Sequence, residues 1–256
     1  MLCSIACAAV AIGLPWLSWE QWPQLSSWLM PGLLAVTGLL CGTLLLRAVG
    51  QLARLRLGAE TLLLFAFLFT LADGAALALT DYRTGQPCCA VTAFGLAFAL
   101  WGDYGRRRGD RLSCRAAAQA KEPYVVTLDE GKWNGKHTYT KEYGPADGFG
   151  SQIQMDDGAQ RIYRVLCPLL ALADVLLAAV ASVGMGRPER LLWCLSCNFT
   201  VCAAFAGGLV YGRPFHLLSR RLALEGAALA GWPGAASAPR DSRVVVTDLD
   251  LFPRGM

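Results

Sequence analysis

The chain has 256 residues, of which 55% are hydrophobic and only 16% are charged, and its mean hydropathy is +0.40. The apolar residues gather in blocks, which is typical of helices surrounded by lipid and differs from the one-sided stripes of a soluble core. No P-loop, dinucleotide-binding glycine pattern, serine nucleophile elbow or HExxH motif occurs. The composition therefore excludes the common soluble enzyme classes and predicts an all-α polytopic membrane protein.

Six apolar blocks are candidate membrane spans. A helix needs about 20 apolar residues to cross a bilayer, so the first and fourth blocks are short. We nevertheless expect six transmembrane helices. The blocks cover residues 2–17, 29–46, 60–80, 88–102, 165–184 and 191–212.

The first block has an alternative interpretation as a signal peptide. No basic residue precedes it, and no small-residue cleavage site stands before the tryptophan cluster that follows. Tryptophans gather at the interface between membrane and water, so the cluster fits a first span better. The cluster consists of Trp16, Trp19, Trp22 and Trp28.

The basic residues predict the orientation, because cytoplasmic loops accumulate Lys and Arg. With six spans and both ends inside, the cytoplasmic segments 47–59, 103–164 and 213–256 hold 20 of the 23 Lys and Arg. We therefore expect an integral plasma-membrane protein with both termini in the cytoplasm and the lipid bilayer as its main partner. The formal net charge of +4 then requires no nucleic-acid partner.

This topology divides the chain into four regions. Residues 1–105 form a four-helix membrane region, and residues 106–163 form a small cytoplasmic insert. Residues 164–213 form a transmembrane helix pair, and residues 214–256 form a cytoplasmic tail. The insert alternates polar and apolar residues around Trp133-Asn134-Gly135, which predicts a β-hairpin with an Asn-Gly turn.

The tail is expected to contain a stalk helix and a strand. The helix continues the sixth span until Gly231 and Pro233 end it. The strand Arg243 to Thr247 follows and leads to Asp248 and Asp250.

Four spans, an insert with β character, two spans, a basic stalk helix and then VVVTD at residues 244–248 resemble the membrane half of the heavy-metal class of P-type cation-transporting ATPases. The resemblance implies cation transport, an actuator-like position for residues 106–163 and a phosphoacceptor position at Asp248. The sequence departs from the family at each motif. DLDLF replaces DKTGT, the insert has no TGES, and Asn198 follows Cys197 where the family places proline. We therefore expect a degenerate or truncated relative, a pseudoenzyme without ATP hydrolysis.

Ionisable and thiol side chains inside predicted spans are the candidate metal ligands. Placing an ionisable group in lipid costs free energy, so its presence in a span indicates a function. Thiolates together with carboxylates favour a soft or borderline cation such as copper or zinc. A transported transition-metal cation is therefore the expected ligand. The candidates are Asp73, Asp174, Cys194, Cys197, Asn198 and Cys202, with Thr200 beside them.

These residues also have purely structural interpretations. Asp73 would cap a helix break at Gly74, Asp174 would bond a hydroxyl or Asn198 on a neighbouring helix, and the cysteines would fill space. Two functional alternatives follow. One is a non-enzymatic module that binds or regulates another membrane protein, and the other is a passive ion channel. His137 and His216 have no ligand partner at short spacing.

Overall fold

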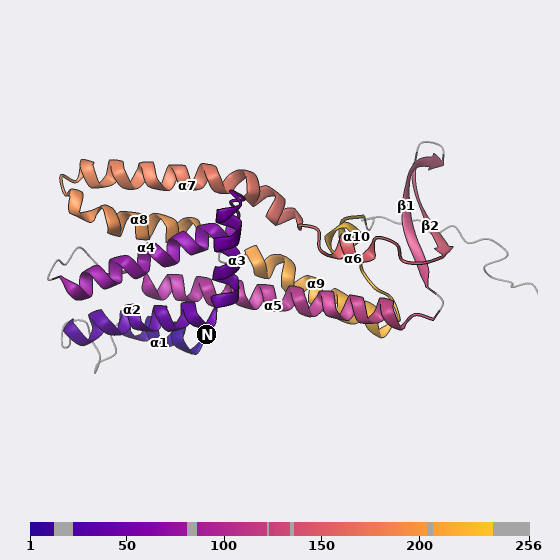
Figure 1. Ribbon diagram of the computed structural model, residues 1–256, viewed down its shortest axis with the longest axis horizontal. Coiled ribbons are helices and arrows are strands. Elements are labelled where there is room, and N and C mark those ends of the chain that lie inside the picture. Colours follow the sequence, from indigo (N-terminus) through magenta and orange to yellow (C-terminus); the bar gives the residue numbers. More distant parts are fainter. Residues whose placement is uncertain (13–22, 81–85, 122, 134–135, 204–206, 238–256) are drawn as a thin grey trace, which may run out of the picture.

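The computed structural model describes residues 1–12, 23–80, 86–121, 123–133, 136–203 and 207–237, and within them the chain is mostly helical (Figure 1). Most of the helices lie side by side, and α3 runs across them. The helices are α1 Leu2–Ile12, α2 Pro23–Leu40, α3 Gly42–Ala53, α4 Ala59–Leu79, α5 Cys89–Gln119, α6 Phe149–Ile153, α7 Gly158–Gly184, the 3-10 helix η1 Pro188–Arg190, α8 Leu191–Cys202, α9 Gly207–Leu224 and α10 Gly231–Ser237; the strands are β1 Tyr124–Trp133 and β2 Lys136–Tyr143.

Two of the described helices, α4 and α7, are long and apolar enough to cross a membrane, and the bent pair of α2 and α3 would make three if it is one span. The structure thus supports a helical membrane protein but not the full count of six spans. Three of the predicted spans do not form helices that are long and apolar enough to be recognised as membrane spans. The helix α1 has only 11 residues, α5 runs from its apolar half into the basic run RRRGDR, and α8 stops at Cys202 after 12 residues.

The second apolar block is broken at Cys41, where α2 and α3 meet at an angle of 79°. Cys41 leaves helical geometry, and its thiol contacts the carbonyl of Leu96 on α5 at 3.7 Å. As a result α3 lies across the bundle and buries one face through Leu44 and Ala48.

The helices α5 and α9 pack with their backbones nearly in contact. Gly102 faces Gly208, and a Cβ placed on Gly105 would lie 3.0 Å from the carbonyl oxygen of Gly212. Farther along, Ser113 donates to Ser219 at 3.3 Å. Glycine is required at positions 102 and 212, because a Cβ at either one would overlap the backbone of the facing helix.

The predicted hairpin is confirmed. β1 and β2 pair antiparallel, with Tyr124 opposite Tyr143 and Thr127 opposite Thr140. The Thr127 and Thr140 hydroxyls lie 3.0 Å apart, and such cross-strand pairs stabilise an isolated ribbon. Residues 134 and 135, where the Asn-Gly turn is expected, lie outside the described residues.

The tail differs from its prediction. Gly231 and Pro233 do not end the stalk helix: α9 already ends at Leu224, and Gly231 begins the short helix α10. A positive φ of 61° at Gly231 lets the backbone turn against Ile153 at this point. The strand expected at 243–247 and Asp248 lie outside the described residues.

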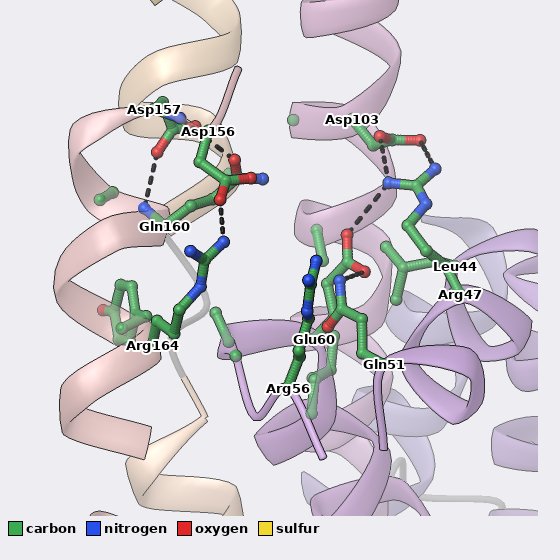
Figure 2. A pocket seen from close by; sticks show the side chains of 18 of the residues that line it. Leu44, Arg47, Gln51, Arg56, Glu60, Asp103, Asp156, Asp157, Gln160 and Arg164 are labelled. Atoms are coloured by element: carbon green, nitrogen blue, oxygen red, sulfur yellow. Dashed lines mark hydrogen bonds and ion pairs between the residues drawn. The ribbon is translucent and has the colours of Figure 1, made fainter. Parts of the chain in front are cut away.

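The helix α7 contains the fifth predicted block, 165–184, and begins with a capping box. The Asp157 carboxylate accepts from the Gln160 backbone N–H at 2.7 Å, and the Gln160 side chain accepts from the Asp157 N–H at 3.2 Å (Figure 2). Two amides that the first turn leaves unpaired are thereby satisfied.

Replacing Asp157 by Ala is expected to lower the free energy of unfolding by about 1 kcal/mol, because one capping acceptor is lost. Thermal unfolding in detergent measures the change. Asp156→Ala is the matched control, since its carboxylate makes only a half-exposed ion pair with Arg164, and such pairs contribute about 0 to 1 kcal/mol. An equal or larger loss from the control would contradict the capping role.

Candidate functional site

A cluster of hydroxyl groups lies buried between the apolar helices. Thr70 of α4, Thr92 of α5 and Thr200 of α8 form a triangle with oxygen separations of 3.0 to 3.2 Å. Ser196 of α8 donates to Thr70 at 3.1 Å. Three helices that are distant in sequence therefore present polar groups to one another in an apolar environment, and we call these four residues the hydroxyl cluster.

Two thiols and a carboxylate lie about one helical turn from the hydroxyl cluster, on the side away from α3. The Sγ atoms of Cys88 and Cys197 are 3.4 Å apart. Asp73 is 6% exposed and lies on α4 about one turn after Thr70, so it is buried at the same level of the bundle as the two thiols. We call Cys88, Cys197 and Asp73 the thiol site.

A second polar contact joins α7 and α8. The Cys202 thiol lies 3.0 Å from Asp174 Oδ1, and the Asn198 amide donates to the Asp174 carbonyl oxygen at 3.2 Å. The other carboxylate oxygen of Asp174 is buried and has no hydrogen-bond partner within the described part of the chain. This contact leaves one acceptor available for a proton, a water molecule or a cation.

Five of the six predicted ligands divide between two places. Asp73 and Cys197 belong to the thiol site, whereas Asp174, Asn198 and Cys202 meet between α7 and α8. Cys194 is buried on α8, one turn before Cys197. Across the described ranges, no group of three or more His, Cys, Asp or Glu side chains is arranged to hold a metal ion.

The structural alternatives for the two aspartates have mixed outcomes. The helix α4 continues through Gly74 to Leu79, so Asp73 caps no break there. Asp174 does contact Asn198, but through its backbone carbonyl rather than its carboxylate.

Sequence reasoning missed Cys88 and the hydroxyl cluster. Cys88, at the start of the fourth block, is not among the predicted ligands, although in the fold it faces Cys197. The available signal was the recurrence of Thr in otherwise apolar blocks, one turn from each candidate: Thr70 before Asp73, Thr92 after Cys88 and Thr200 after Cys197.

A charged cluster closes the bundle near α3 (Figure 2). Arg47 binds Asp103 through two bonds of 2.9 and 3.2 Å and binds Glu60 at 3.0 Å. Gln51 donates to the other Glu60 oxygen at 3.0 Å, and Arg107 binds Asp103 at 2.9 Å. A two-bond arginine–carboxylate pair fixes orientation as well as charge, so the cluster ties α3 to the start of α4 and to α5.

His216, on the part of α9 beyond the last predicted span, is half-buried. Partial burial, with Arg108 and Arg220 nearby, lowers its pKa below the usual 6.5. Its buried Nδ1 has no hydrogen-bond partner within the described residues.

These polar side chains lie within an apolar helix bundle, in the thiol site, in the hydroxyl cluster and in the contact between Asp174 and Cys202. Comparison of the chain with protein-family models, with curated proteins and with solved structures finds no match.

Proposed function

We propose that this chain is a membrane protein that binds and passes a soft or borderline cation, such as copper(I) or zinc, and that it is related in layout to the heavy-metal P-type ATPases. The observation that supports this proposal most is the pair of Cys88 and Cys197 thiols at 3.4 Å, with the buried Asp73 at the same level of the bundle. As thiolates the two cysteines are soft donors, and the Asp73 carboxylate adds a hard one.

The burial of these groups supports binding over packing. A carboxylic acid and a column of hydroxyls in a membrane bundle cost free energy that alkyl side chains would not. The hydroxyl cluster continues from the thiol site toward α3, so a cation that leaves the thiols meets oxygen donors next. In this proposal Asp174 and Cys202 form a second contact point between α7 and α8.

The proposal includes the full predicted topology. It stays a prediction that there are six spans, with α5, α8 and α1 crossing the membrane in addition to α4, α7 and the bent pair of α2 and α3. The location in the plasma membrane and the cytoplasmic position of both termini are predictions as well. The role given to the chain is cation binding. ATP hydrolysis forms no part of it, and Asp248 is assigned no function.

The test is a titration of the purified full-length protein in detergent with copper(I) and with zinc, each in competition with a coloured chelator. We expect saturable binding that falls in Cys197→Ser and in Asp73→Asn. Cys114→Ser is the control, because Cys114 is an exposed cysteine on the part of α5 beyond the bundle. It should bind like the wild type.

Other outcomes distinguish the alternatives. Unchanged metal binding in both Asp174→Ala and Cys197→Ala would remove the transport-site assignment. Absence of saturable binding would favour a module that binds a membrane-protein partner. Cation flux that survives removal of residues 214–256 and stops in Asp73→Asn would favour a passive channel.

A further inference from the structure

A cavity of about 460 Å³ lies at the end of the bundle near α3, separate from the thiol site (Figure 2). Its walls come from α3, the start of α4, α5, the start of α7 and α9. One part of the wall is apolar, with Leu44, Leu57, Leu63 and Ala99, and the rest is strongly charged. The cavity is therefore amphipathic.

The charged part of the wall has more arginines than it can pair. Five arginines and four carboxylates line the cavity, a surplus of one positive charge. Arg47, Arg106 and Arg164 each make an ion pair with an acidic residue of the wall. Arg54 and Arg56 are exposed and make no ion pair with any described residue.

The backbone places these two arginines together. Between them, Leu55 has a φ of 54°, a left-handed conformation that is unfavourable for leucine. The turn is closed by hydrogen bonds from Arg56 N to Gln51 O and from Leu55 N to Leu52 O, both at 2.9 Å. Figure 2 shows the Arg56 side chain extended beside Glu60.

Gln51 adds a further unpaired group to the wall. Its Nε2 donates to Glu60, while its Oε1 is buried and has no partner within the described residues. The cavity thus presents two cationic donors and one neutral acceptor.

We infer that this cavity binds the headgroup of an anionic phospholipid, with Arg54 and Arg56 contacting its phosphate and Leu57 and Leu63 contacting the start of its acyl chains. The cavity lies where the candidate spans α4 and α7 begin, which is the level of lipid headgroups. A headgroup that has hydroxyls, such as that of phosphatidylglycerol, also supplies the donor that Gln51 Oε1 lacks. Free phosphate would leave the apolar wall uncovered.

The experiment measures binding of short-chain phosphatidylglycerol to the delipidated full-length protein in neutral detergent, with phosphatidylcholine and inorganic phosphate as comparison ligands. We expect saturable binding of phosphatidylglycerol, with one lipid retained per chain in native mass spectra. The double variant Arg54→Gln/Arg56→Gln should weaken this binding by at least about tenfold, because two charge-assisted hydrogen bonds are lost.

The matched control is Arg111→Gln/Arg115→Gln, which removes the same charge from exposed positions of α5 that do not line the cavity. It should bind like the wild type. Arg56→Lys keeps the charge and should retain most of the affinity, which guards against a double variant that fails to fold.

Three results would overturn the inference. An equal loss in the control would show a general charge effect. Inorganic phosphate that competes at the same concentration as phosphatidylglycerol would assign the cavity to a soluble phosphate. Equal binding of phosphatidylcholine and phosphatidylglycerol, unchanged in the double variant, would show that the arginines do not select lipid. None of these results affects the cation proposal, because the thiol site lies elsewhere.

Discussion

Gly102→Ala and Gly212→Ala are each expected to lower the free energy of unfolding by about 1 to 3 kcal/mol, the usual range for overpacking. A methyl group on Gly102 would overlap the backbone of Gly208, and one on Gly212 would overlap the carbonyl of Gly102. The obstacle is main chain in both cases, so no side chain can rotate away. The two helices must separate, which also disturbs Ser113 and Ser219.

Thermal unfolding of the full chain in one detergent checks this expectation. Gly184→Ala is the control, since nothing lies within 4 Å of a Cβ at this end of α7. It should be neutral or slightly stabilising, because alanine is the better helix former. Wild-type stability in both test variants would mean that α5 and α9 are not in backbone contact.

Mild oxidation with diamide is expected to join Cys88 and Cys197 in a disulfide in most molecules of the wild-type chain. The two thiols give up two protons and two electrons to diamide, which is reduced to its hydrazine. Their Sγ atoms need to approach from 3.4 Å to about 2.05 Å, a small movement for two side chains at facing helix positions. Peptide mapping by mass spectrometry identifies the bond.

The thiol site makes a stronger prediction for the same reaction. Prior addition of zinc or copper(I) should slow disulfide formation by an order of magnitude or more, since the bound cation occupies the thiolates. Cys88→Ser should abolish the cross-link, whereas Cys114→Ser should leave it intact. If the cation does not change the rate of cross-linking, the two cysteines do not form the proposed binding site.

Several elements could be predicted from the sequence because local pattern determines them. The third and fifth apolar blocks became α4 and α7, since continuous runs of apolar residues have no competing signal. The hairpin followed from alternation around an Asn-Gly pair. In each case the residues that define the element are adjacent in the chain.

Other features depend on contacts that no local pattern reveals. The break at Cys41 lies inside an uninterrupted apolar block and involves Leu96, 55 residues away. Cys88 and Cys197 are 109 residues apart in the sequence. Their contact has to be known before either thiol can be identified as a candidate ligand. Arg54 and Arg56 also looked like ordinary loop charges, because their lack of a partner is evident only when the carboxylates around them are placed.

X-ray absorption at the metal edge of the full-length protein, loaded with copper(I) or zinc, tests the central proposal most directly. The account predicts sulfur neighbours at about 2.3 Å, as for thiolate ligands in proteins, and their replacement by oxygen or nitrogen in Cys88→Ser/Cys197→Ser. A wild-type spectrum with only oxygen and nitrogen neighbours, or one that the double substitution leaves unchanged, would contradict a cation site at Cys88 and Cys197.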